Sequence, residues 1–193
     1  MSALEQKGVL REELLERRQE LPASEVLVAS RRIMERCVES IPWANIKSLH
    51  SYAPMAARKE VNSWWLLEYV WEHQPHVTTV SPIIQSGLMQ SVAIDDTTRW
   101  RESLAGIPEP LNGIPLPDDQ HFDVIIIPIV GFDRHGHRLG YGKGHYDKFL
   151  STQPDALKLG VAYAVAEVEL AIPAEPHDVP LQHIVTESEI IYV

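Results

Sequence analysis

A run of four branched apolar residues, Val124-Ile125-Ile126-Ile127, constrains the fold of this chain more than any other feature. The run lies within the segment 122–130, and such an uninterrupted apolar stretch is typical of a strand that is buried on both faces. Helical patterns alternate with this and other short strand candidates along the chain. The sequence therefore predicts an α/β fold, in which a mostly parallel sheet is flanked by helices.

Helical spacing and turn residues predict the other elements. Leu10, Leu14 and Leu21 recur at near-helical intervals, and Ser24 is the expected N-cap of a second helix that runs through Cys37. Prolines and glycines crowd the segment 105–119, which predicts a loop. Strands are further predicted at 46–52, 77–80, 88–93, 157–165 and 190–193, and helices at 63–73, at 167–171 and from about His145 onward.

Length, charge and composition restrict the class of protein. We expect one domain, residues 1–193, because this length is near the usual size of a single core. A net charge of −10 argues against a nucleic-acid surface, and the chain has neither an apolar stretch long enough to span a bilayer nor a secretory signal. The single cysteine cannot form an intramolecular disulfide. These features predict a soluble cytoplasmic monomer or weak homodimer with no nucleic-acid or membrane partner.

The segment 131–148 carries the chemistry. It follows the buried strand directly, and its glycines allow backbone N–H groups to approach phosphate oxygens. Arg138 and Lys143 supply cations, and Asp147 supplies a hard oxygen ligand for Mg²⁺. A glycine-rich connection with solvated charges is the alternative. Neither the Walker A loop nor the dinucleotide fingerprint is present, so the residues alone indicate an anion site of unspecified type.

The pattern within this segment resembles a known family signature. Gly131-Phe132-Asp133 is followed by Arg138-Leu139-Gly140-Tyr141-Gly142-Lys143-Gly144-His145-Tyr146-Asp147, which is similar to the signature of 5-formyltetrahydrofolate cyclo-ligases. Other parts of the chain also resemble this family: Lys7 with Arg11, Met55 with Glu60-Val61-Asn62, Trp100, and the segments 107–110 and 175–181.

The resemblance implies roles for individual residues. The implied catalytic residues are Arg138, Lys143 and Tyr146. The implied ATP-binding residues are Lys7, Arg11, Arg138, Leu139, Gly140, Tyr141, Gly142, Lys143, Gly144, His145 and Tyr146. The implied substrate-binding residues are Met55, Glu60, Trp100, Tyr141 and His145. The implied metal ligands are Asp147 and Asp178, which would bind Mg²⁺.

The resemblance also implies a fold and a reaction. The fold is the three-layer Rossmann-like arrangement that the family shares with sugar-phosphate isomerases and CoA transferases. The reaction is the cyclisation of 5-formyltetrahydrofolate to 5,10-methenyltetrahydrofolate, with ATP as co-substrate and release of ADP and phosphate. The partners are therefore a reduced folate and ATP. Two alternatives are a non-catalytic folate or nucleotide binder, and an isomerase or CoA transferase on the same fold.

One residue departs from the family pattern. The family commonly has two consecutive tyrosines before the signature aspartate, and His145 stands in the first of these positions. Histidine can titrate near neutral pH, so we expect a pH-sensitive step between about pH 6 and pH 8 if the ring contacts the reactants. The alternative is a solvent-facing residue in the first turn of the helix.

Overall fold

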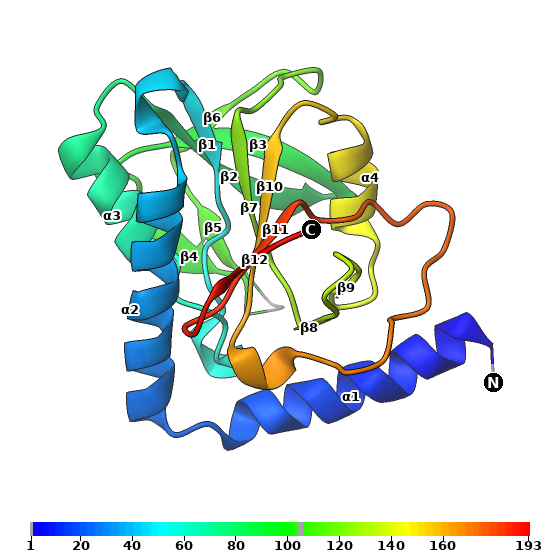
Figure 1. Cartoon of the computed structure of the whole chain (residues 1–193). Coiled ribbons are helices and arrows are strands. Elements are labelled where there is room, and N and C mark those ends of the chain that lie inside the picture. The colour runs from blue at the N-terminus through cyan, green and yellow to red at the C-terminus, as the bar shows by residue number, and fades with distance from the viewer. Residues whose placement is uncertain (1, 104–105) are drawn as a thin grey trace.

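The computed structural model describes residues 2–103 and 106–193, and Figure 1 shows the elements. The helices are α1 (Ala3–Glu20), α2 (Ala23–Ser40), α3 (Trp64–His73) and α4 (His145–Ser151), with short 3₁₀ helices at Trp43–Asn45, Ala56–Arg58 and Ala164–Ala166. The strands are β1 (Ser48–His50), β2 (Thr78–Gln85), β3 (Leu88–Ile94), β4 (Trp100–Glu102), β5 (Pro108–Pro110), β6 (Ile114–Pro115), β7 (Val124–Pro128), β8 (Gly131–Phe132), β9 (Arg138–Leu139), β10 (Leu157–Val161), β11 (His183–Val185) and β12 (Ile190–Tyr192).

Eight strands in the described part of the chain form one sheet, in the order β12-β11-β10-β7-β1-β2-β3-β6. Neighbouring strands from β11 to β2 are parallel. Strands β12, β3 and β6 pair antiparallel at the two edges. The predicted mostly parallel sheet is confirmed, and the apolar run forms its central strand β7.

Strand β7 separates two hydrophobic clusters, because alternate side chains of a strand point to opposite faces. Val124 and Ile126 pack in the cluster that includes residues of α2 and α3, whereas Ile125 and Ile127 pack with Leu150 of α4. All four β7 side chains are fully buried. Helices α2 and α3 lie on one side of the sheet and α4 on the other, so the sheet is covered on both faces as predicted (Figure 1).

Helix α1 lies across one end of the sheet, and its buried face carries two cations (Figure 1). The buried residues of this helix are Lys7, Leu14 and Arg18. Leu14 packs against Val130 and Leu139, from the segment that follows β7. Because Lys and Arg are costly to bury without partners, this face of α1 depends on acceptors from other elements.

The start of α2 differs from the prediction. The helix begins at Ala23, its N-cap is Pro22 rather than Ser24, and no side chain caps it. Pro22 has φ −59°, which is fixed by its ring, and the chain enters the helix directly after it. Cys37 is fully buried, and burial raises the pKa of its thiol to about 12. No helix in the described residues is long and apolar enough to cross a membrane.

Prolines also stand inside strands where the sequence suggests breaks. Pro82 lies within β2, beyond Val80, at which the pairing with β1 ends. Beyond Val80, β2 pairs only with β3. The edge of β2 that faced β1 has no partner strand at Pro82, so the missing N–H of the proline removes no hydrogen bond there. The segment 105–119, predicted as a loop, similarly contains the edge strands β5 and β6. Ala105, the first residue of that predicted loop, lies outside the described residues.

The predicted helix over 167–171 does not form. The chain makes a 3₁₀ turn at Ala164–Ala166 and then runs extended, with a bridge between Glu167 and Phe132. The Val168 N–H donates to the Phe132 carbonyl at 2.9 Å, and Glu167 pairs with Arg134 at 2.6 Å. These contacts with the β8–β9 hairpin hold residues 167 and 168 in an extended conformation in place of a helix.

His50, the last residue of β1, is fully buried, and neither ring nitrogen has a hydrogen-bond partner among the described residues. Its ring lies near those of Phe122 and Phe149, with centroid distances of 5.2 and 4.6 Å. Burial lowers the pKa of His50 from 6.5 to about 3, because the charged ring would lose its hydration. The folded protein therefore holds this ring neutral.

We expect acid to destabilise the protein through His50. The unfolded ring binds a proton near pH 6.5 and the folded ring does so only near pH 3, so the free energy of unfolding falls as the pH drops through this window. The loss from this group is about 2 kcal/mol between about pH 6.5 and pH 5. Urea unfolding at both pH values should show a smaller loss in His50→Leu than in the wild type. His121→Leu, at an exposed position, should behave like the wild type; an unchanged pH dependence in His50→Leu would contradict this account.

Candidate active site

The glycine-rich segment forms a short hairpin and a loop at the end of β7. Strands β8 and β9 pair through Gly131 with Leu139 and Phe132 with Arg138, and the loop then leads into α4. Gly142 in this loop has φ +82°, and a Cβ there would lie 3.2 Å from the Arg11 Cζ atom. Glycine at this position therefore permits both the left-handed backbone and the close approach of Arg11.

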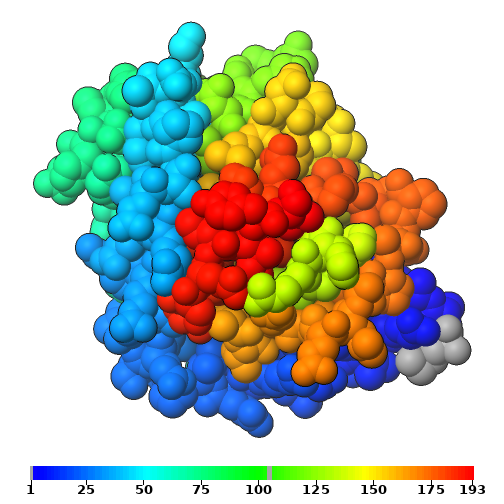
Figure 2. Space-filling model, in the orientation of Figure 1, coloured from blue at the N-terminus to red at the C-terminus, as the bar shows by residue number. Residues whose placement is uncertain are grey.

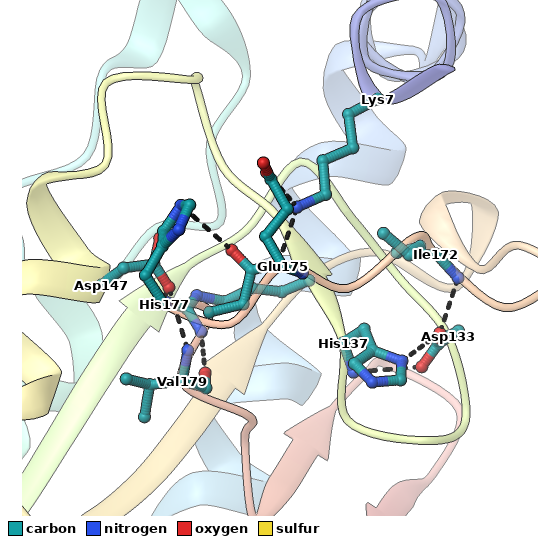
Figure 3. Close-up of polar contacts among 10 residues, drawn as sticks. Lys7, Asp133, His137, Asp147, Ile172, Glu175, His177 and Val179 are labelled. Atoms are coloured by element: carbon teal, nitrogen blue, oxygen red, sulfur yellow. Dashed lines mark hydrogen bonds and ion pairs between the residues drawn. The ribbon is translucent and has the colours of Figure 1, made fainter. Parts of the chain in front are cut away.

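Asp133 in this hairpin has a structural role. It is buried, and its carboxylate accepts hydrogen bonds from the amides of His135, His137 and Ile172 at 2.8, 3.0 and 2.8 Å. The His137 ring lies 2.8 Å from the same carboxylate (Figure 3). Burial alone would raise the pKa of Asp133, but these hydrogen bonds outweigh it and lower the pKa below its ordinary value. Asp133 thus ties the hairpin to the segment before β11.

The surface view shows the same arrangement. In Figure 2 the yellow-green atoms of the hairpin lie between the red C-terminal residues and the orange segment that precedes β11. That orange segment also borders the blue atoms of α1. Residues from the start, the middle and the end of the chain therefore meet around the glycine-rich segment.

Lys7 and Arg11 of α1 both contact this region. The Lys7 ammonium, whose side chain is 7% exposed, lies 2.6 Å from an oxygen of Asp178 and 3.0 Å from one of Glu175. Burial alone would lower the pKa of Lys7, but the hydrogen bonds and negative charges of the two carboxylates raise it above its ordinary value. Arg11 donates from Nε to the Gly140 carbonyl at 2.7 Å. Lys7 thus contacts the segment that precedes β11 and Arg11 contacts the glycine-rich loop, while their predicted binding of ATP stays a prediction.

Arg138 and Asp147 form an ion pair within the signature itself. The Arg138 guanidinium donates to Asp147 Oδ1 at 2.6 Å and also donates to the Val179 carbonyl. The Val179 amide donates to the same Asp147 oxygen at 3.2 Å. The first turn of α4, the strand β9 and the segment after Asp178 are therefore joined, as Figure 3 shows for Asp147 and Val179.

One of the two predicted metal ligands, Asp178, lies in a cluster of side chains that could hold a metal ion. Glu175, His177 and Asp178 offer ligand atoms that all lie within 4.8 Å of one another. Asp147 is not part of this group, and its carboxylate instead accepts from Arg138 and from the Val179 amide. Carboxylate oxygens are the ligands that Mg²⁺ prefers, so the donors fit this ion. Burial alone would raise the pKa of Asp178, but the Lys7 hydrogen bond and the Glu175 amide outweigh it and lower the pKa. The sequence analysis assigned no role to Glu175 or His177, although both stand in the segment 175–181.

A second group of contacts surrounds Glu60. One Glu60 oxygen accepts from the Met55 amide and the other from the Tyr141 hydroxyl, each at 2.6 Å. Arg18 donates to the same tyrosine oxygen at 2.7 Å. The predicted substrate-binding residues Met55, Glu60 and Tyr141 are therefore brought together. The sequence analysis missed Arg18, although its spacing from Lys7 and Arg11 places all three on one helical face.

Tyr146 and His145 begin α4. The Tyr146 hydroxyl is buried without a hydrogen-bond partner among the described residues. Burial, followed by the nearby charge of Glu60, raises the pKa of Tyr146 despite the opposing effect of Arg138. His145 is half-buried, and burial, followed by the charges of Lys148 and Lys143, lowers its pKa below 6.5. If titration of the His145 ring produces an inflection in the plot of reaction rate against pH, we therefore expect that inflection below pH 6.5.

Three predicted residues lie apart from these contacts. Lys143 is exposed and forms no hydrogen bond or ion pair within the described residues. The Leu139 side chain is buried with Leu14 in the core beneath α1. The Trp100 ring packs edge to face on Trp64, at 4.7 Å between centroids. No hydrogen bond or ring contact among the described residues joins Trp100 to Glu60 or to the glycine-rich loop.

Comparison with known proteins gives a consistent result. The sequence profile of the 5-formyltetrahydrofolate cyclo-ligase family matches residues 3–187. A 5-formyltetrahydrofolate cyclo-ligase from Mycoplasma pneumoniae is 28% identical, over 94% of this chain and 99% of that protein. One from Haemophilus influenzae is 27% identical, over 89% and 92%. The NMR structure of Aquifex aeolicus 5,10-methenyltetrahydrofolate synthetase is similar with a TM-score of 0.80 at 28% identity, covering 96% of this chain and 92% of that one.

Proposed function

Since this chain belongs to the 5-formyltetrahydrofolate cyclo-ligase family, we propose that it catalyses the ATP-dependent cyclisation of 5-formyltetrahydrofolate to 5,10-methenyltetrahydrofolate, with release of ADP and phosphate. One contact carries the proposal in this chain: the Tyr141 hydroxyl lies 2.6 Å from Glu60. Tyr141 belongs to the loop that resembles the family's nucleotide-binding signature. Glu60 resembles the acidic residue that binds folate in this family. The two substrates would therefore bind next to each other.

Four cations are proposed to bind the ATP phosphates. Lys7, Arg11 and Arg138 lie around the glycine-rich loop, and Lys143 projects from it. Three of them already have oxygen partners within the protein. Phosphate oxygens would replace or share these partners, so the cations are held in place before the nucleotide arrives.

Asp147 and Asp178 are proposed to hold Mg²⁺, with Glu175 beside them. When bound, the ion would neutralise charge on the phosphates. In the structure Asp147 pairs with Arg138 and Asp178 with Lys7. If Asp147 and Asp178 held the ion, Arg138 and Lys7 would be available to bind phosphate oxygens.

The proposed reaction has two chemical steps. The formyl oxygen attacks the γ-phosphorus of ATP as the bond to the ADP oxygen breaks. N10 of the folate then attacks the formyl carbon, loses its proton, and phosphate leaves with the former formyl oxygen. Arg138 and Lys143 would stabilise the negative charge that shifts between these oxygens. Tyr146, whose buried hydroxyl has a raised pKa and no partner among the described residues, would donate a hydrogen bond in this site.

Coupling between the two substrates tests this proposal against its rivals. We expect ADP and phosphate to appear only when 5-formyltetrahydrofolate is present, in equal amounts with the cyclised product. A non-catalytic binder would bind both ligands without releasing ADP. ATP hydrolysis that is unchanged by omission of the folate would contradict the proposed reaction.

A further inference from the structure

Arg18 is a buried cation next to the proposed folate site, and none of the roles above uses it. The residue is 5% exposed, and its Nη2 atom donates a hydrogen bond to the Tyr141 hydroxyl at 2.7 Å. Its Nε atom is buried with no hydrogen-bond partner among the described residues. A buried donor without a partner costs stability, so the fold gains nothing from this atom itself.

The contacts of Arg18 determine the direction of the neighbouring hydrogen bonds. A guanidinium has donors only, so the Tyr141 oxygen must accept from Arg18. The single hydroxyl hydrogen of Tyr141 is then free to point only toward Glu60, at 2.6 Å. The second Glu60 oxygen accepts from the Met55 amide at 2.6 Å. Both carboxylate oxygens therefore act as acceptors, which is the pattern of an ionised group.

On the basis of the proposed function, we infer that Arg18 is a positioning residue for substrate binding: it acts through Tyr141 to keep Glu60 ionised and oriented toward the pterin ring. A reduced pterin presents adjacent N–H donors at its amino edge, and an ionised carboxylate can accept from both. A protonated Glu60 would place a hydrogen on one of its oxygens and lose part of this match.

The charges around Glu60 support a specific role for Arg18. The pKa of Glu60 lies above its ordinary value, because burial raises it by more than the Met55 amide, the Tyr141 hydroxyl and the charges of Arg18 and Arg58 lower it. Arg58 is exposed, so water screens its charge more than that of buried Arg18. The other titratable groups that face Glu60 are phenols: Tyr52, Tyr146 and Tyr163. Arg18 is thus the buried cation of this cluster among the described residues.

Titration of Glu60 in the ligand-free protein gives a direct test. Carbon-13 NMR of protein labelled at glutamate carboxyl groups can follow Glu60, with its signal assigned by Glu60→Gln. We expect the Glu60 pKa to rise by about one unit or more in Arg18→Met, and to rise also in Tyr141→Phe. Arg18→Lys, which keeps the charge, should show a smaller rise. Arg17→Met is the matched control, because Arg17 is exposed and pairs with Glu13 rather than with Tyr141.

Kinetics supply a second readout that a purely structural residue would not change selectively. In Arg18→Met we expect the KM for 5-formyltetrahydrofolate to rise, most strongly at acid pH, with kcat and the KM for ATP little changed. If Arg18→Met does not fold, Arg18→Lys and Tyr141→Phe carry the same test. A Glu60 titration that is identical in the wild type, Arg18→Lys and Tyr141→Phe would overturn the inference. Wild-type protein that forms no cyclised product would instead refute the proposed function, and the ligand-free titration would remain decisive for Arg18.

Discussion

Asp147→Asn is expected to reduce Mg·ATP turnover by roughly 100- to 1,000-fold, the scale of losing one group that stabilises charge in the transition state. Asparagine keeps an oxygen in the position that accepts from the Val179 amide, so the contact with the segment after Asp178 can persist. It loses the negative charge that a Mg²⁺ ligand needs. We therefore expect a large loss of activity together with a smaller loss of thermal stability, because Arg138 also loses its anionic partner.

Two controls make this result specific. Asp118→Asn changes an exposed carboxylate that forms no hydrogen bond or ion pair among the described residues, and it should retain both turnover and melting temperature. Raising the Mg²⁺ concentration should recover little activity in Asp147→Asn, because a neutral amide is a poor ligand for this ion. Wild-type turnover in Asp147→Asn, or full recovery at high Mg²⁺, would remove Asp147 from the proposed metal site.

Arg138→Met and Lys143→Met are expected to differ, although both residues are proposed to bind phosphate. Arg138 is 6% exposed and holds Asp147 and the Val179 carbonyl together. Its loss should reduce kcat/KM for ATP by roughly 100-fold or more. It should also lower the free energy of unfolding by roughly 1–3 kcal/mol, less than for a fully buried pair because Asp147 is 23% exposed.

Lys143→Met should have a narrower effect. Lys143 is exposed and forms no hydrogen bond or ion pair among the described residues, so its loss should leave the melting temperature unchanged. We expect a higher KM for ATP, a lower kcat, or both. Denaturant unfolding, steady-state kinetics and equilibrium titration with a nonhydrolysable nucleotide would measure these quantities in both variants. A loss of folate affinity with unchanged nucleotide affinity would contradict the assignment of either cation.

The sequence predicts the architecture well where a pattern of side chains is compatible with only one arrangement of strands and helices. The run Val124-Ile125-Ile126-Ile127 requires cover on both faces, and the structure supplies it from α2 and α3 on one side and α4 on the other. The helix from His145 is likewise predicted because glycines end immediately before it. Local patterns fail where tertiary context decides: Pro82 is tolerated inside β2 only because β1 has already ended.

The candidate site was predicted less completely, for the same reason. The residue types and spacing of the segment 131–148 indicate an anion site, whereas a phosphate-binding role for Lys7 and Arg11 is implied only by the resemblance to the family. The partners of these groups lie far away in sequence: Asp178 is the partner of Lys7, and Tyr141 that of Glu60. In the sequence, the only sign that Arg18 is buried is its helical spacing from Lys7 and Arg11. Its contact with Tyr141 depends on how the glycine-rich loop folds.

The central claim is that this chain closes the ring of 5-formyltetrahydrofolate at the expense of ATP. The most direct measurement is the ultraviolet absorbance of 5,10-methenyltetrahydrofolate after mixing the protein, Mg·ATP and 5-formyltetrahydrofolate at neutral pH, with Asp147→Asn as the inactive counterpart. We predict an absorbance rise that requires protein, ATP and Mg²⁺ together and that is nearly lost in the variant. No rise above the protein-free blank, or a rise that persists without ATP, would contradict the proposed function.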